Sequence, residues 1–364
     1  MPVSISGTNG VTFPDSSLQT AAASPFGLKN RIINGDMVID QRNAGASIAS
    51  GYPVDRFTVD VSQTSKLTAQ QNQGSVTPPA GFTNYLGITS SSAYSVISSD
   101  FFLISQRIEG FNIADLNWGT ANAQTVTLSF WVRSSLTGTF GGSLRNNDDS
   151  RSYVFSYTIS AANTWEQKTI TIAGDTTGTW NRTTGRGVNL SIGIGTGSSL
   201  CTTAGSWVSG SFLNVTGATS VVGTNGATFY ITGVQLERNT TATPFEWIPY
   251  TTELQLCQRY YYKLGGSSIN EFVATGLAFN STRFFTSTYL KTSMRASPTS
   301  VEYSSLRIQN IGAAYTVTAV VLSGNQGKEI GATEMNVASG LTTNGYYYAD
   351  TSSTSGYLAF NAEL

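Results

Sequence analysis

The chain has 364 residues but no histidine, only two cysteines and few charged side chains, with 20 lysines and arginines against 21 aspartates and glutamates. The absence of histidine excludes Ser-His-Asp triads, Cys-His dyads and histidine-ligated metal sites. Two cysteines, Cys201 and Cys257, are too few for a disulfide framework or a structural zinc site. We expect both to be buried free thiols, with one bridge between them as the alternative.

The charge balance and the lack of long apolar runs exclude further classes of protein. A formal net charge of -1 gives no electrostatic footprint for nucleic acid. No apolar run reaches the roughly 18 residues of a candidate membrane helix, and the first residues lack the basic and apolar regions of a signal peptide. We therefore expect neither nucleic-acid binding nor membrane insertion.

Uncharged polar residues take the place of charge, with 46 serines and 49 threonines, and aromatic residues make up 11% of the chain. Short runs of Val, Ile, Thr, Tyr and Phe alternate with polar residues and end at Gly, Asn, Ser or Pro, which predicts strands almost throughout. Helical periodicity is confined to residues 252–260. The predicted fold class is all-β, with four parts: a short attachment hairpin in residues 1–25, a jelly-roll β-sandwich in 26–250, a short helical linker in 251–262 and a smaller C-terminal β-sandwich in 263–364.

An Asn-Gly turn near the N-terminus predicts the hairpin. Val3 and Ile5 alternate with polar residues before Asn9-Gly10, and Val11 and Phe13 alternate after it. An isolated two-stranded hairpin is only marginally stable in water. We therefore expect these four apolar side chains to mediate attachment or oligomerisation.

The strands of the two sandwiches are predicted from the same alternation. In the first they are 55–61, 101–108, 125–133, 151–159, 167–172, 188–194 and 227–236. In the second they are 272–279, 283–291, 300–308, 315–322, 345–349 and 356–362. In the clearest strand, Val126, Leu128, Phe130 and Val132 share one face, which should line the core between two sheets. In each tyrosine triplet, 260–262 and 346–348, at least one ring should point away from its core.

Exposed aromatic rings beside polar groups suit the binding of sugars, whose apolar faces stack on rings and whose edges form hydrogen bonds. The candidate glycan-binding residues are Trp131, Arg133, Tyr153, Tyr157, Trp165 and Trp180. A ring in a β protein is equally suited to the core or to a subunit interface, and this alternative stays open for each of them.

Carboxylates offer two other kinds of site. Asp148 and Asp149 lie in the oxygen-rich run 146–149 and could contribute to a structural calcium site, whereas a solvated turn is the simpler interpretation. We expect no other cofactor. Glycosidases need paired carboxylates, but the acidic residues are scattered without a pattern, and we do not expect an enzyme.

Four groups of segments carry a resemblance to a known family. They are Gly7–Asp15 with Leu18–Thr20, Ile33–Arg42 with Asp55–Phe57, Tyr230–Glu237 with Pro244–Glu246 and Leu256–Tyr261, and Met294–Thr299. Together they resemble tail fibre proteins of tailed bacteriophages, including those of cyanophages. The second and third groups look like the beginning and end of the carbohydrate-binding-like jelly roll of such fibres.

The resemblance implies a virion protein of the tail fibre, assembled in the cytoplasm of a bacterial host and usually a homotrimer. It also implies attachment to a baseplate protein through the N-terminal hairpin and adhesion to host envelope polysaccharide as the receptor. The alternatives are a purely structural fibre adaptor or connector without glycan binding and, less favoured, a glycan depolymerase.

Overall fold

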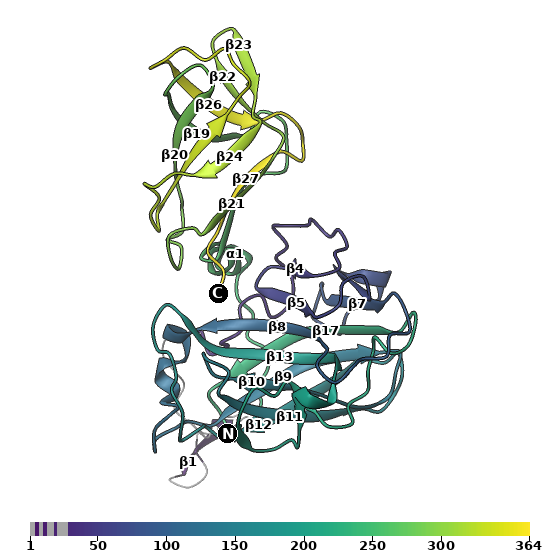
Figure 1. Ribbon diagram of the computed structural model, residues 1–364. Coiled ribbons are helices and arrows are strands. Elements are labelled where there is room, and N and C mark those ends of the chain that lie inside the picture. The colour runs from purple at the N-terminus through teal and green to yellow at the C-terminus, as the bar shows by residue number, and fades with distance from the viewer. Residues whose placement is uncertain (1–3, 7–9, 13–17, 20–27) are drawn as a thin grey trace.

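The computed structural model describes residues 4–6, 10–12, 18–19 and 28–364. The molecule consists of two β-sandwiches stacked end to end, with one short α-helix between them (Figure 1). The all-β, double-sandwich fold expected from the sequence is therefore confirmed. None of the helices in the described part of the chain is long and apolar enough to span a membrane.

Three short strands, β1 (Ser4–Ser6), β2 (Gly10–Thr12) and β3 (Leu18–Gln19), form an N-terminal sheet. β1 and β2 pair antiparallel with Ile5 opposite Val11, so the predicted hairpin is present. Val3 and Phe13 lie outside the described residues. The role of this hairpin in attachment stays a prediction.

The first sandwich is built from two antiparallel sheets. The seven-stranded sheet runs in the order β15 (Trp207–Ser209), β11 (Arg151–Ile159), β10 (Gly138–Arg145), β13 (Arg186–Thr196), β8 (Phe101–Glu109), β5 (Phe57–Val61) and β4 (Gly51–Val54). The five-stranded sheet runs in the order β12 (Glu166–Ile172), β9 (Val126–Ser134), β17 (Thr228–Glu237), β7 (Leu86–Ser90) and β6 (Leu67–Gln71). A parallel pair, β14 (Cys201–Thr202) and β16 (Asn214–Val215), and 3₁₀ turns at Gln73–Ser75, Gly110–Leu116 and Ser198–Leu200 complete it.

The core of this sandwich follows the alternation of β9. Val126, Leu128, Phe130 and Val132 are all fully buried between the sheets, as the sequence predicts. Burial of each such side chain contributes roughly 1.5–3 kcal/mol. The apolar face of β9 is therefore turned inward, toward the core between the two sheets.

The second sandwich packs a three-stranded sheet on another seven-stranded sheet. The small sheet is β18 (Tyr261–Gly265), β27 (Tyr357–Asn361) and β21 (Ser300–Ser304). The large one is β23 (Ala313–Thr316), β22 (Leu306–Asn310), β26 (Tyr346–Thr351), β19 (Phe272–Ala278), β20 (Arg283–Tyr289), β25 (Ile330–Asn336) and β24 (Ala319–Leu322). Phe284, Met335, Tyr347 and Phe360 are among the side chains buried between the two sheets.

Two predicted strands are each divided in the structure. The range 300–308 becomes β21 and β22, which belong to different sheets, because Ser305 adopts a left-handed conformation with φ of 45°. The range 315–322 includes the end of β23 and all of β24. A bend at one serine leaves no mark in the hydrophobic alternation, so the sequence did not predict it.

The helix α1 (Tyr250–Gln258) and a buried polar cluster join the two sandwiches. Arg56 of the first sandwich is 2% exposed and forms an ion pair with Glu363 near the C-terminus. Arg259, just after α1, binds both carboxylate oxygens of Glu109 at 2.9 and 2.7 Å, and Tyr260 donates to Glu109 at 2.8 Å. These contacts fix the second sandwich against the first.

The junction covers the rings of the first tyrosine triplet that point away from the core of the second sandwich. Tyr260, Tyr261 and Tyr262 are all at least 98% buried, because the first sandwich covers the ring that would otherwise point outward. The guanidinium of Arg42 lies 3.7 Å from the ring centre of Tyr261. The outward face of a strand is exposed to solvent only where no neighbouring domain covers it.

Both cysteines are free thiols. Cys257 is fully buried at the junction, where burial raises the pKa of its thiol. Cys201 is only half-buried, so the expectation of two buried thiols is correct for Cys257 alone.

Candidate functional site

The outer face of the seven-stranded sheet in the first sandwich contains an open groove of about 640 Å³. Its floor follows from the alternation of β8, where Phe102, Ile104 and Ile108 enter the core and Leu103 and Arg107 point outward into the groove. The groove is thus formed by the faces of the strands that the core does not use.

The strand register places three polar side chains in one row across this floor. Arg107 of β8 lies opposite Asn189 of β13, and Asn189 lies opposite Arg145 of β10. Side chains directly opposite each other in an antiparallel sheet are roughly 5 Å apart at Cβ. Asn189 is therefore flanked on both sides by a guanidinium group.

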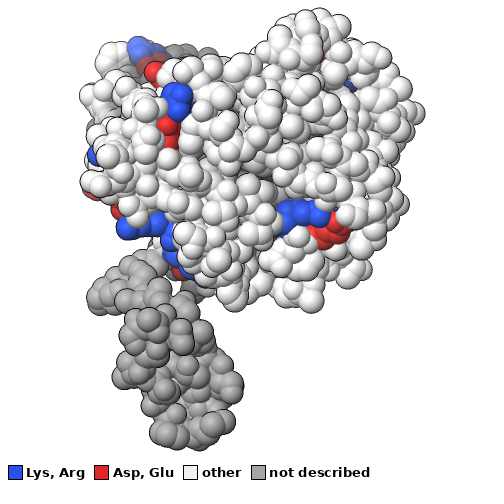
Figure 2. Space-filling view, turned by 90° about the horizontal axis from the view of Figure 1, so that it is seen from below, with Lys and Arg blue, Asp and Glu red and all other residues white. Residues whose placement is uncertain are grey.

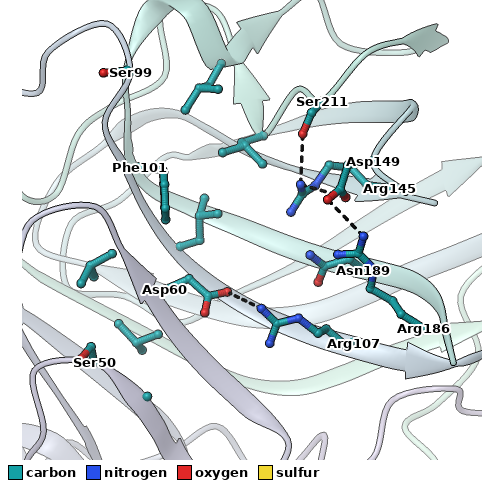
Figure 3. A pocket seen from close by; sticks show the side chains of 16 residues that line it. Ser50, Asp60, Ser99, Phe101, Arg107, Arg145, Asp149, Arg186, Asn189 and Ser211 are labelled. Atoms are coloured by element: carbon teal, nitrogen blue, oxygen red, sulfur yellow. Dashed lines mark hydrogen bonds and ion pairs between the residues drawn. The ribbon is translucent and has the colours of Figure 1, made fainter. Parts of the chain in front are cut away.

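Two carboxylates face the guanidinium groups in the groove (Figure 3). The guanidinium of Arg145 lies 3.0 Å and that of Arg186 3.1 Å from the two carboxylate oxygens of Asp149. Arg107 lies 3.7 Å from Asp60, a distance too long for a hydrogen bond. With three arginines against two aspartates, the lining of the groove carries one net positive charge.

Burial leaves some of these polar atoms without a partner. Asn189 is 2% exposed and Arg145 is 8% exposed, yet Asn189 Oδ1 and Arg145 Nε find no hydrogen-bond partner among the described residues. Burial lowers the pKa of Arg145, as do the nearby guanidinium groups of Arg186 and Arg107, against the raising effect of Asp149 and Asp60. The site therefore contains polar groups whose bonding the protein leaves incomplete.

The groove also has apolar lining. Phe101 lies away from Arg145 and Arg186 (Figure 3), and Leu103, Leu200 and Leu213 are further apolar side chains of the lining. Leu200 and Leu213 belong to the segment 198–215, which packs on the sheet where glycine permits a close approach. A Cβ atom at Gly193 would lie 2.2 Å from Asn214 Nδ2, so any larger residue would displace this wall.

Three of the six sequence-predicted glycan-binding residues lie on the other sheet. Trp131 and Arg133 are half-buried on β9, and Arg133 Nε donates to the carbonyl oxygen of Asn163 at 2.8 Å. Trp165 is also half-buried, and its indole N–H donates to the carbonyl oxygen of Thr77 at 2.8 Å. These three side chains are partly accessible but do not line the groove.

The other three are packed inside the first sandwich. Tyr153, Tyr157 and Trp180 are 8%, 7% and 7% exposed. The ring of Tyr157 lies 5.1 Å from that of Phe130, and the ring of Trp180 lies 4.8 Å from that of Trp118. Strand β11 turns Tyr153 and Tyr157 inward, and Trp180 packs against Trp118 and Trp207, so these rings offer no stacking surface to a sugar, contrary to the sequence interpretation.

The two aspartates considered for calcium take different roles. Asp148 accepts hydrogen bonds from the backbone N–H and the hydroxyl of Ser150, and the hydroxyl bond lowers its pKa. Asp149 pairs with the two groove arginines. In the part of the chain that the structure describes, no three or more Asp, Glu or Cys side chains group together as a metal site would need. Calcium binding stays a prediction without support from this geometry.

The sequence contained a weak signal for the groove residues. In β13, Val188, Leu190 and Ile192 alternate with Asn189 and Ser191, which predicts a polar outer face. However, the meeting of Asn189 with Arg107 and Arg145 depends on the pairing of strands far apart in the chain.

Elsewhere, the surface of the molecule carries little charge. Figure 2 shows one face on which most of the surface is uncharged and the few blue and red side chains mostly lie next to each other. Against this background, the groove brings five charged side chains together on the outer face of one sheet.

No family model and no curated protein matches this chain. Three solved structures show a distant similarity. The enzymatically active domain of tailspike protein 4 of bacteriophage CBA120 is 11% identical with a TM-score of 0.33, over 57% of this chain and 21% of that one. A family 11 carbohydrate-binding module from Clostridium thermocellum is 10% identical with a TM-score of 0.28, over 55% of this chain and 97% of that one. An exo-beta-agarase is 10% identical with a TM-score of 0.30, over 71% of this chain and 35% of that one. These values assign no family, and the function of the groove rests on its own residues.

Proposed function

We propose that the groove on the seven-stranded sheet of the first sandwich binds a saccharide of the host envelope. The observation that carries this proposal is the combination, in one open groove, of apolar lining and a row of polar side chains. A volume of about 640 Å³ lies within the usual range for small-molecule sites, roughly 300–1,000 Å³. Phe101 and Leu103 suit the apolar face of a sugar ring, and Asn189 with its flanking arginines suits its oxygen atoms.

We propose binding without cleavage. A glycosidase needs one carboxyl group to donate a proton to the leaving oxygen and a second carboxylate as base or nucleophile. Asp60 and Asp149 are the carboxylates of the groove, and each faces an arginine. Asp149 is paired with both Arg145 and Arg186, so the groove does not offer two unpaired carboxylates.

The larger assignment, a virion tail-fibre protein that attaches to the baseplate by its N-terminus, is supported by the sequence resemblance. On this proposal the chain forms a homotrimer, and three weak sites on one rigid body gain avidity through effective concentration. Light scattering on the purified chain tests the trimer, and a monomeric mass at assembly concentrations would contradict it.

A bulky side chain introduced into the groove tests the saccharide proposal. Ser211 is exposed on the groove wall, where its hydroxyl accepts a hydrogen bond from Arg145 at 3.2 Å, and Ser211→Trp should remove this bond and fill the groove without disturbing the core. Ser206→Trp, on the same connecting segment but outside the groove lining, is the matched control. We expect Ser211→Trp alone to lose binding to host envelope polysaccharide and the ability to block phage adsorption. Equal binding by both variants would exclude the groove.

A second candidate, a structural adaptor between fibre components, is favoured by a different surface. The outer face of the second sandwich exposes Leu277, Tyr289 and Tyr346, at 53%, 81% and 67%. Contiguous exposed apolar side chains often mark a protein interface. If the purified chain fails to bind host cells or envelope glycan at micromolar concentration, the adaptor is the better proposal.

A further inference from the structure

We infer that the groove selects an acidic saccharide, whose anionic group lies among Arg107, Arg145 and Arg186. This inference rests on the proposed saccharide binding and names the class of ligand. It follows from the distribution of charge in the groove rather than from its shape.

The first step is the excess of positive charge. The three arginines are opposed by two carboxylates, and one of those carboxylates, Asp149, is shared between Arg145 and Arg186. The guanidinium of Arg107 lies 3.7 Å from Asp60, which is too far to donate a hydrogen bond to it. An anion in the groove would complete this arrangement, because arginine N–H groups bind carboxylate, sulfate and phosphate oxygens with charge-assisted hydrogen bonds.

The second step is the burial of unsatisfied groups. A guanidinium group that is only 8% exposed is unfavourable unless opposite charge and hydrogen bonds compensate it, and Arg145 Nε lacks a partner among the described residues. Asn189 Oδ1, between Arg107 and Arg145, lacks one too. Asn189 can accept a hydrogen bond from a sugar hydroxyl while the arginines hold the acidic group.

The third step is the polarity of the groove. Arg145 and Arg186 lie together and Phe101 lies away from them (Figure 3). A sugar ring with an acidic substituent has the same polarity, an apolar face and a charged edge. A neutral sugar could accept hydrogen bonds from the arginines but would leave the charge excess uncompensated.

Binding of defined oligosaccharides to the full chain tests the inference. The probes are a galacturonate tetrasaccharide with its carboxyl-reduced counterpart, and a heparin tetrasaccharide with its desulfated counterpart, so that the two pairs separate carboxylate from sulfate recognition. We expect at least one acidic probe to bind about tenfold or more tightly than its counterpart, with affinity falling as salt rises. Acidic and neutral members bound equally would overturn the acidic selectivity and leave the proposed function standing. Binding of none of the probes would overturn both.

Two variants separate specific recognition from general attraction. Arg107→Gln with Arg186→Gln should weaken the acidic probe by about tenfold or more and the neutral one by much less. Arg238→Gln removes one positive charge from a half-exposed position outside the groove and should change neither by more than about twofold. Melting temperatures confirm that each variant is folded. Equal losses in the double variant and in Arg238→Gln would show attraction by net charge alone, contrary to the inference.

Discussion

Each sandwich contains a seven-stranded sheet, but the outer faces of the two sheets have opposite chemistry. In the first, the row across neighbouring strands reads Arg107, Asn189, Arg145. In the second, the corresponding row reads Tyr346, Leu277, Phe285, Glu334, Val321. The first outer face is polar and partly roofed by the segment 198–215, whereas the second is aromatic and open.

The difference shows that the covering layer, rather than the composition of a strand, decides whether an aromatic ring is buried or exposed. Rings of the first sandwich, such as Trp118 and Trp180, are enclosed between its sheets. In the second sandwich Tyr347 is buried, but its neighbours Tyr346 and Tyr348 are 67% and 38% exposed, because none of the described residues forms a layer over that face. Four predictions test this contrast, in order of decreasing effect.

The largest effect is expected at the enclosed rings. Trp180→Ala should lower the free energy of unfolding by about 3–5 kcal/mol, since it removes a ring packed 4.8 Å from Trp118 and 5.3 Å from Trp207. Tyr289→Ala, at an 81% exposed ring of the second sheet, is the control and should change it by less than about 0.5 kcal/mol. Denaturant unfolding measures the free energy of unfolding of both variants. Similar losses in Trp180→Ala and Tyr289→Ala would contradict the difference between the two sheets.

The second effect concerns Glu253, on the helix α1 between the two sandwiches. Burial raises the pKa of Glu253 to about 7 and that of Asp55 to about 6. Because the folded chain holds these protons more tightly, stability should fall as pH rises from about 4 to 7, by up to about 3 kcal/mol for Glu253. Glu253→Gln should flatten this decline in unfolding curves measured at successive pH values. An unchanged decline in the variant would assign the pH dependence to other groups.

The third effect concerns the polar row itself. Asn189→Ala removes a buried oxygen without a partner, so stability should stay within about 1 kcal/mol of the parent or rise, while saccharide affinity falls several-fold. Calorimetry of unfolding and of binding on the same preparation separates the two quantities. A variant that loses stability but keeps its affinity would show that Asn189 supports the sheet and not the ligand.

The smallest effect is expected on the aromatic row. Leu277→Ser should change the free energy of unfolding by less than about 0.5 kcal/mol, because the side chain is 53% exposed. A loss of several kcal/mol that depends on protein concentration would instead show that this row is covered by another copy of the chain.

The all-β class and the inward face of β9 could be predicted from the sequence, because alternation along one strand is local information. The groove could not be predicted, because Arg145 lies on β10, a strand rich in glycine and serine that the alternation does not reveal. There glycine is required by close packing, as a Cβ atom at Gly142 would lie 2.1 Å from the carbonyl oxygen of Ser191.

The segments that carry the family resemblance contribute to the junction rather than to the groove. Arg56, Tyr260 and Arg295 come from three different groups of these segments and all lie where the sandwiches meet. None of the three lines the groove. The segments that carry the resemblance therefore contribute residues to the junction between the sandwiches. The residues that we propose to select the ligand lie outside these segments.

The position of Glu363 has a mechanical consequence. The strands that enter and leave the second sandwich, β18 and β27, are paired, and Glu363 returns beside them to Arg42, at 3.2 Å, and to Arg56. Arg295 holds the same end by donating to the carbonyl oxygens of Ala362 and Glu363, at 2.9 and 3.0 Å. A pull on the far end of the second sandwich thus reaches the first along two parallel paths, the covalent chain through α1 and this ionic clamp. Two separated points of support resist bending as well as stretching, so the molecule should transmit force as a lever rather than swing as a hinge.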